Sequence, residues 1–250
     1  MAKVLIAGES WMTTSTHVKG VDEFSVHSYV EGVGPLKNAL EASGHEVIHM
    51  PAHKVPMDFP GNRAALNEYD VVVLSDIGAN SIQLAPGVFE RFIPGEDRLQ
   101  ALADWTRGGG ALVMIGGYLS FSGIQARAAF RNTAVADVLP VEILPEDDRW
   151  ELPAGMSGVV HIPGHQVLGS AGEEWPLLLG YNRTVLKEGS ELVASINGDP
   201  LIALSEQGDG RSAVFTSDCS PHWAPTAFCE DWTGYREIFD GIIRWVSKMA

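Results

Sequence analysis

Positive charge is scarce in this chain of 250 residues, which has 17 Lys and Arg against 32 Asp and Glu and a formal net charge of −15. The affinity of proteins for nucleic acids is built on Lys and Arg side chains that neutralise phosphates. The composition therefore argues against a general nucleic-acid binder and against binding to anionic membrane surfaces. Small-molecule ligands stay open, because the local field inside a site can oppose the net charge.

Long apolar runs and cysteines are scarce too. No apolar run approaches the roughly 20 residues of a membrane span, and VLIAG after Lys3 is too short for the core of a signal peptide. The two cysteines, Cys219 and Cys229, fit neither a C-x-x-C metal pair nor a disulfide framework. These absences predict a protein of the reducing cytoplasm, folded as one domain over residues 1–250.

Two common nucleotide-binding motifs are also missing. The sequence contains no G-x-x-x-x-G-K-[ST] segment, and GESWM follows the first apolar run where a dinucleotide-binding fold has G-x-G-x-x-G. The histidine pairs His45/His49 and His161/His165 fall in a predicted strand or around Pro and Gly, unlike a helical zinc pair. The histidine pairs therefore predict no metal site, and the sequence leaves the cofactor undetermined.

The first half of the chain alternates apolar runs with helical segments. The predicted strands are Lys3–Gly8, His45–Met50, Tyr69–Asn80 and Ala111–Gly117, and the predicted helices lie between Pro35 and Gly44 and between Gly95 and Gly110. This β-α-β-β-α-β order is typical of an α/β fold with an open, mostly parallel sheet and helices on both faces.

Short strands dominate the second half. They are predicted at Val141–Pro145, Gly158–His165, Pro176–Leu186 and Glu191–Gly198, followed by a hairpin that turns at Gln207–Gly210 and a helix over about Asp231–Met249. The pattern predicts a β-rich insertion near residues 140–185.

Ligands of open α/β sheets bind outside the carboxyl ends of the strands. The segments Gly8–Trp11, Ser75–Asn80 and Gly117–Ser122 follow three predicted strands and should line one crevice. The longer stretch Gly8–Phe24 is predicted as a polar loop, either functional or solvated and pinned by Trp11.

Two segments carry candidate catalytic residues. ALVMIGGYLSFSG, Ala111–Gly123, predicts either a strained elbow with Tyr118 at its tip or a tight turn with a packed tyrosine. TSDCSPHW, Thr216–Trp223, places Asp218, Cys219 and His222 within five positions. One interpretation of this crowding is a histidine base or metal ligand beside an activated thiol. The alternative is a plain turn, because Ser, Asp and Pro are typical turn residues.

The chain resembles the class I glutamine amidotransferase-like superfamily, which has a flavodoxin-like fold, and within it the neighbours of the ThuA-like group. SDIGAN, IGGYLSFSG and SDCSPHW carry the resemblance, which spans nearly the whole chain. It implies an elbow at Gly116–Ser120, in which Tyr118 stands where the family has its nucleophilic cysteine and Ser120 replaces a glycine. It also implies an oxyanion loop at Ile77–Ala79, including Gly78, with the Leu119 amide as second donor.

The departures from the family pattern argue against glutaminase chemistry, because a phenol of pKa about 10 cannot replace a thiolate. His222 is the nearest match to the family's histidine, but it lacks the following Glu. One hypothesis is a hydrolase-like or metal-assisted enzyme for a sugar or amide, with Tyr118 as acid or hydrogen-bond donor and His222 as base or metal ligand. The ligand-binding residues would be Trp11, Gly78, Ala79, Leu119 and Ser120.

The second hypothesis is a non-catalytic binding or structural protein on a degenerate amidotransferase fold. Its interface in a homo-oligomer would come from the aromatic residues Trp150, Trp175 and Tyr181 of the predicted insertion.

Overall fold

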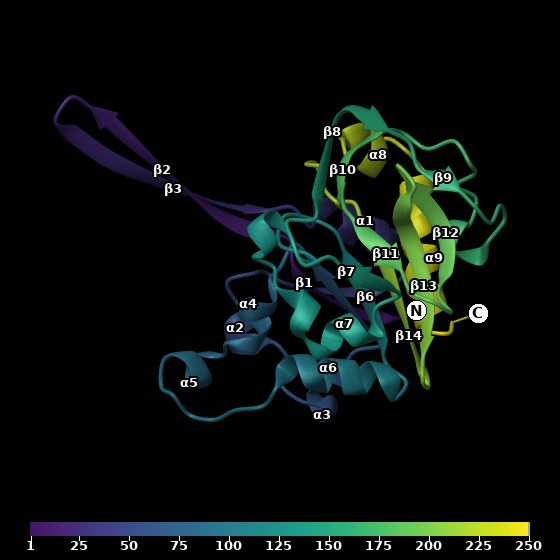
Figure 1. Ribbon diagram of the computed structural model, residues 1–250, viewed down its shortest axis with the longest axis horizontal. Coiled ribbons are helices and arrows are strands. Elements are labelled where there is room, and N and C mark those ends of the chain that lie inside the picture. Colours follow the sequence, from purple (N-terminus) through teal and green to yellow (C-terminus); the bar gives the residue numbers. More distant parts are fainter. Residues whose placement is uncertain (250) are drawn as a thin grey trace.

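An eight-stranded sheet forms the centre of the structure, a computed structural model that describes residues 1–249 (Figure 1). Its strand order is β4-β1-β5-β6-β14-β13-β12-β9. The bounds in this order are Glu46–Met50, Lys3–Gly8, Val71–Ser75, Ala111–Ile115, Gly210–Phe215, Asp199–Gln207, Glu191–Ile196 and Val159–Val160. The first five are parallel and the last three are antiparallel. The predicted α/β fold with a mostly parallel sheet is confirmed.

The five parallel strands have a doubly wound order. Numbered one to five in chain order, they are β1, β4, β5, β6 and β14, and their order across the sheet is 2-1-3-4-5. In such an order the connection after β1 lies on one face of the sheet and the connection after its neighbour β5 lies on the other, which opens a crevice at the carboxyl ends of these two strands. The topology thus places any site at Gly8 and Ser75.

Helices cover both faces of the sheet, because alternate residues of the buried strands point to opposite sides. On one face, Val4 and Ile6 of β1 pack with α1 (Gly34–Ala42) and α9 (Gly234–Val246). On the other, Leu5 and Ala7 pack with five further helices. These are α2 (Val55–Asp58), α3 (Arg63–Leu66), α4 (Ala79–Gln83), α6 (Arg98–Arg107) and α7 (Ala134–Val138). Among residues 1–249, no helix has the length and apolar content needed to cross a membrane.

Two small sheets occupy the region predicted as β-rich. β7 (Val141–Ile143) pairs with β11 (Thr184–Leu186), and β8 (Arg149–Met156), a strand that the sequence did not predict, pairs with β10 (Leu178–Asn182). The interface predicted here is wrong for two of its three aromatic residues. Trp175 and Tyr181 are buried in the core, and only Trp150 is exposed.

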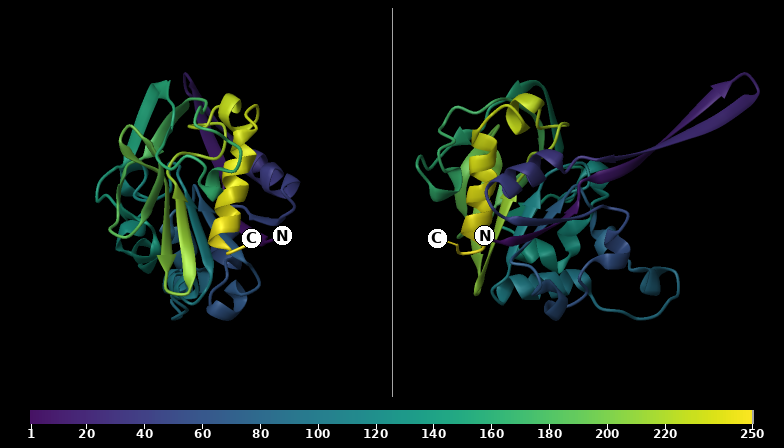
Figure 2. Two further views of the ribbon diagram at one scale, coloured as in Figure 1. Left: turned by 90° about the vertical axis from the view of Figure 1, so that its right-hand side faces the viewer. Right: turned by 180° about the vertical axis from the view of Figure 1, so that it is seen from behind.

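The stretch predicted as a polar loop is a long β-hairpin. β2 (Ser10–Lys19) and β3 (Asp22–Glu31) pair over ten consecutive residues and project away from the body (Figures 1 and 2). The loop prediction is wrong because Thr, Val, Tyr and Phe favour an extended backbone even without a buried face. We call residues 10–31 the arm.

Candidate functional site

The carboxyl ends of β1, β5, β6 and β14 meet around a cavity of about 550 Å³. All three segments that were predicted to converge contribute to it. Its lining residues are Glu9, Trp11, Asp76, Tyr118, Leu119, Ile124, Arg127, Asp218, Ser220, Pro221 and His222. The volume is within the range of small-molecule sites. We call this cavity the crevice.

The strained residues at the crevice are two carboxylates. Glu9 and Asp76 follow β1 and β5 directly. Their backbone φ angles are 45° and 43°, values that residues other than glycine rarely adopt. A hydrogen bond from the backbone N–H holds each residue in place. Glu9 N–H donates to the Ser75 carbonyl at 3.0 Å, and Asp76 N–H donates to the side-chain Oγ of Ser120 at 3.1 Å. Strain of this kind collects at functional sites. Glu9 and Asp76 lie in two of the segments that were predicted to converge, but neither was among the predicted site residues.

Gly117, the second glycine after β6, makes room for Asp76. A side chain at Gly117 would place Cβ 2.9 Å from Asp76 Oδ1, and the φ of Gly117 is 145°. Tyr118 itself is not among the residues of positive φ. The predicted elbow thus turns sharply, but its strain does not fall on Tyr118.

Tyr118 forms a wall of the crevice. Its hydroxyl donates to Glu151 Oε1 at 3.2 Å, and the Arg149 guanidinium lies 5.0 Å from its ring centre. Burial and the neighbouring Glu151 raise the pKa of Tyr118 above its usual 10. Its ring meets His222 edge-on, with 4.4 Å between ring centroids. The geometry gives Tyr118 a neutral hydroxyl with a protein partner and an aromatic edge that positions His222.

Two of the amides expected to form an oxyanion hole already have partners. Leu119 N–H donates to Asp76 Oδ1 at 2.7 Å, and Ala79 N–H donates to the Ala128 carbonyl at 2.8 Å. Gly78, Ala79 and Ser120 are not among the lining residues of the crevice, whereas Leu119 and Trp11 are. The family-type oxyanion hole is therefore not formed, because Asp76 accepts from one of its donors.

Asp218 and His222 form a hydrogen-bonded couple at the end of β14. Asp218 is 3% exposed, and its Oδ2 lies 3.1 Å from His222 Nδ1. This bond raises the pKa of His222 above its usual 6.5. Within residues 1–249, His222 Nε2 makes no hydrogen bond of its own, and the ring lines the crevice. The couple resembles the arrangement by which a carboxylate orients a histidine base.

Glu9 lines the crevice and Cys219 lies close to it, and both residues are buried. Ser75 Oγ donates to Glu9 Oε1 at 3.1 Å and lies 3.5 Å from Cys219 Sγ, while Glu9 Oε2 has no hydrogen-bond partner. Burial, reinforced by nearby carboxylates, raises the pKa of both Glu9 and Cys219. An activated thiol at Cys219 does not fit these surroundings, because burial and the charges of Glu9 and Asp218 disfavour its thiolate.

Three of these side chains are arranged as metal ligands could be. Glu9, Asp218 and Cys219 each place one ligand atom within 4.8 Å of the others. The histidine pairs considered from the sequence lie elsewhere and contribute nothing to this cluster.

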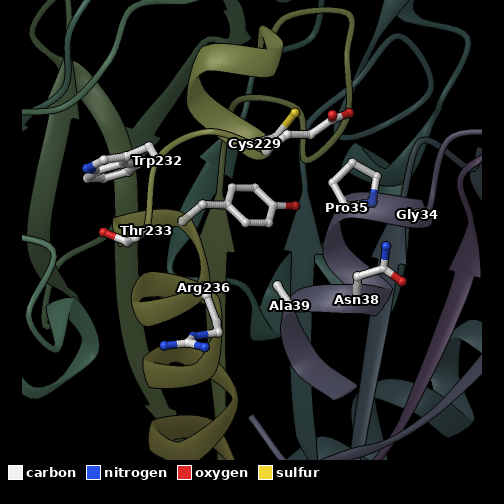
Figure 3. A pocket seen from close by; sticks show the side chains of 10 residues that line it. Gly34, Pro35, Asn38, Ala39, Cys229, Trp232, Thr233 and Arg236 are labelled. Carbon is white, nitrogen blue, oxygen red and sulfur yellow. The ribbon is translucent and has the colours of Figure 1, made fainter. Parts of the chain in front are cut away.

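A second hollow, of about 600 Å³, lies between α1 and the start of α9 (Figure 3). Its lining includes Pro35 and Asn38 on one side and Trp232 and Arg236 on the other. The hollow is also lined by Cys229, whose thiol donates to the Ala224 carbonyl. Burial raises the pKa of this thiol to about 11. We place the candidate site in the crevice, where several titratable groups converge, rather than here.

The comparisons with known proteins agree with this architecture. A family model described as "Putative glutamine amidotransferase" matches residues 3–248. The Salmonella typhimurium proteins STM3548 and STM1381, both named as cytoplasmic, are 40% and 42% identical, with TM-scores of 0.94 and 0.93. The alignments cover 98% of this chain in both cases, and 98% and 99% of those chains.

A ThuA-like protein of Bacteroides uniformis shares the fold, with a TM-score of 0.55 at 11% identity over 98% of this chain and 90% of that one. No curated protein gives a significant match. The match over nearly the whole chain shows that this protein belongs to the GATase1-like family of glutamine amidotransferase-like proteins, as the three sequence segments indicated.

Proposed function

We propose that the crevice binds a small neutral polar ligand, a sugar or an amide, and transfers protons on it, with His222 as the base and Asp76 as the acid. The observation that carries this proposal is the 3.1 Å contact between Asp218 Oδ2 and His222 Nδ1. It fixes the imidazole through one nitrogen and leaves the other for the ligand.

Asp76 supplies the complementary group. Burial and the neighbouring Asp218 raise its pKa to about 6, so the carboxyl group can hold a proton close to neutral pH. A carboxyl group whose pKa is raised toward neutral pH can act as the acid beside a histidine base. In a hydrolytic step, His222 would take the proton of the attacking water, and Asp76 would give its proton to the leaving group.

The character of the walls supports a neutral ligand. With Glu9 and Asp76 protonated, as their raised pKa values favour, and with His222 neutral as the base, Asp218 and Arg127 balance, so the lining offers an anion no net positive charge. Trp11 and Tyr118 offer aromatic surface, and carboxylates accept hydrogen bonds from hydroxyl or amide groups.

A glutaminase mechanism through a thioester has little support. Tyr118 stands at the elbow, and Cys219 is buried with a raised pKa, so neither provides a thiolate. The proposed reaction proceeds without a covalent bond to either residue.

The first experiment is a ligand screen with a panel of neutral mono- and disaccharides and primary amides. Binding is measured by the shift in Tm, and turnover is followed by NMR. For at least one compound we expect turnover that falls about 10²- to 10⁴-fold in His222→Gln, the usual contribution of a positioned base. The control is His161→Gln, since His161 bonds Ser195 away from the crevice. Unchanged turnover in His222→Gln would contradict the proposal.

A second candidate function is binding without catalysis. It is favoured by the hydrogen bond from Leu119 N–H to Asp76, which occupies a donor that an acyl-transfer site would need. The same panel separates the two functions, because a compound that raises the Tm but stays unchanged in the NMR spectra for days supports the binding role.

A further inference from the structure

The arm has no packing partner within its own chain over most of its length. Every residue of β2 and β3 after Ser10 is exposed, and the two strands pair only with each other. Ten residues at about 3.3 Å each carry the tip roughly 30 Å outward, and Figure 1 and the right view of Figure 2 show it clear of the body. Beyond its root, where Tyr29 meets His53 and Trp11 lines the crevice, the arm therefore packs on no other element in an isolated molecule.

The arm is uncharged along its shaft. From Trp11 to Val18 and from Phe24 to Val30 there is no Asp, Glu, Lys or Arg, in a chain whose net charge is −15. Directly paired residues of antiparallel strands share a face. The pairs Trp11–Val30, Thr13–Ser28, Ser15–Val26 and His17–Phe24 thus share one face, which has no charged side chain and carries four large apolar side chains that are 40–49% exposed. Such an exposed stripe marks an interaction site.

The backbone edges of the arm are unprotected as well. The register has no bulge, and the strands contain neither proline nor, before Lys19 at the tip, any lysine. Natural proteins use these devices to blunt exposed edges, and an isolated two-stranded hairpin is only marginally stable in water. Another molecule is needed to cover the arm.

The chain carries a second exposed apolar surface that could receive it. Around α5 (Pro86–Phe89), Phe89, Phe92 and Ile93 are 63%, 86% and 56% exposed. The arm and α5 leave the body on the same side, the left of Figure 1. A two-fold axis on that side would place each arm over the other copy's α5 surface in a self-complementary contact. Acidic copies repel each other elsewhere, so an uncharged shaft suits contact between them.

We propose that the arm packs, through the face of Trp11, Phe24 and Val26, on the α5 surface of a second copy of this chain. The contact would also steady the crevice, because Trp11 lines the cavity and Gly32 N–H at the root of the arm donates to the Glu9 carbonyl at 2.9 Å. The assembly is independent of what the crevice binds, so either proposal can fail without the other.

The test is the mass of the full chain, measured by light scattering on a sizing column at about 50 µM, where a contact of micromolar affinity is saturated. We expect the wild type at twice 26.9 kDa or a higher even multiple. The double variants Phe24→Ser/Val26→Ser and Phe89→Ser/Phe92→Ser should both fall to 26.9 kDa. The matched control is Val185→Ser, a body-strand valine 51% exposed against 49% for Val26, which should keep the assembly.

Circular dichroism spectra like that of the wild type will show that the variants are folded. A monomeric wild type overturns the proposal, as does an arm variant that keeps the assembled mass. An assembly that survives Phe89→Ser/Phe92→Ser overturns α5 as the receiving surface. A monomer that sediments with phosphatidylcholine–phosphatidylserine vesicles through the arm assigns the arm to a membrane and also overturns the proposal.

Discussion

β1 and the arm are separated by one residue, Glu9, and their physical surroundings are opposite. Val4 to Ala7 are fully buried between two helical layers, and β1 has a hydrogen-bonded strand on each side. The arm is exposed on both faces and along both outer edges. Both stretches have residues that favour strands, so the local preference for an extended backbone does not distinguish them. What differs is the surface available to cover each strand.

The comparison also explains the placement of the crevice. β1 ends where the chain must leave the buried sheet for the exposed arm, and Glu9 takes the strained conformation at this junction. The crevice is thus formed where the most buried and the most exposed parts of the chain meet. Three predictions sharpen this contrast.

The largest effect is expected on the buried side, at Asp218. Asp218→Asn removes the carboxylate that orients His222, so turnover of the compound identified in the panel should fall about 10²- to 10⁴-fold. The hydrogen bond to Asp218 raises the pKa of His222, so its loss lowers that pKa. The acidic limb of the pH–rate profile, which reports deprotonation of the base, should therefore move to lower pH.

Asp209→Asn, in the exposed β13–β14 turn, is the control for this measurement. A limb that stays in place or moves to higher pH would show that Asp218 does not act through His222.

A smaller effect is expected on stability at Asp76. Its folded pKa of about 6 exceeds the ordinary value of 3.8, so its contribution to stability is full below about pH 4 and is lost as the pH rises through 6. The Asn side chain of Asp76→Asn does not titrate, so the variant does not lose this contribution. From pH 4 to pH 8, the free energy of unfolding of the variant should therefore rise by about 3 kcal/mol relative to that of the wild type. Urea unfolding at both pH values measures it. The same difference for Asp209→Asn should be flat, and a flat result for Asp76→Asn would sink the prediction.

The smallest effect is expected on the arm. Val18→Ala changes a residue that is 67% exposed near the tip, so the free energy of unfolding should change by less than about 0.5 kcal/mol. The matched Val73→Ala in β5, where Val73 is 1% exposed, should cost about 2 kcal/mol through lost burial and the cavity left behind. Urea unfolding compares the two. Equal costs would mean that the arm is as buried as the sheet.

The fold could be predicted where periodicity and punctuation agree. The buried parallel strands, α1, α6 and α9 were found because their apolar residues recur at the expected spacing and glycines end the elements. β8 was missed because Pro153 and Gly155 read as breakers, yet they lie in a short two-stranded sheet where few pairs are needed. The arm was missed because its polar residues read as a loop.

The candidate site was predicted in outline. Strand ends placed Trp11, Tyr118, Asp218 and His222 together, since carboxyl ends of parallel strands share one edge of the sheet. Leu119 also reaches the crevice, but its amide bonds Asp76, so its expected role as a donor could not be read from spacing alone. Which groups have partners depends on contacts between strands far apart in sequence.

The sequence by itself determined the α/β fold and the convergence of the strand ends on one crevice, because both follow from short-range patterns of apolar residues, glycines and prolines. Only the tertiary structure decided that Glu9 and Asp76 carry the backbone strain, that Cys219 is a buried neutral thiol, and that residues 10–31 leave the body as an arm. Burial and the pairing of polar groups depend on which distant segments pack together, and no local pattern in the sequence records that.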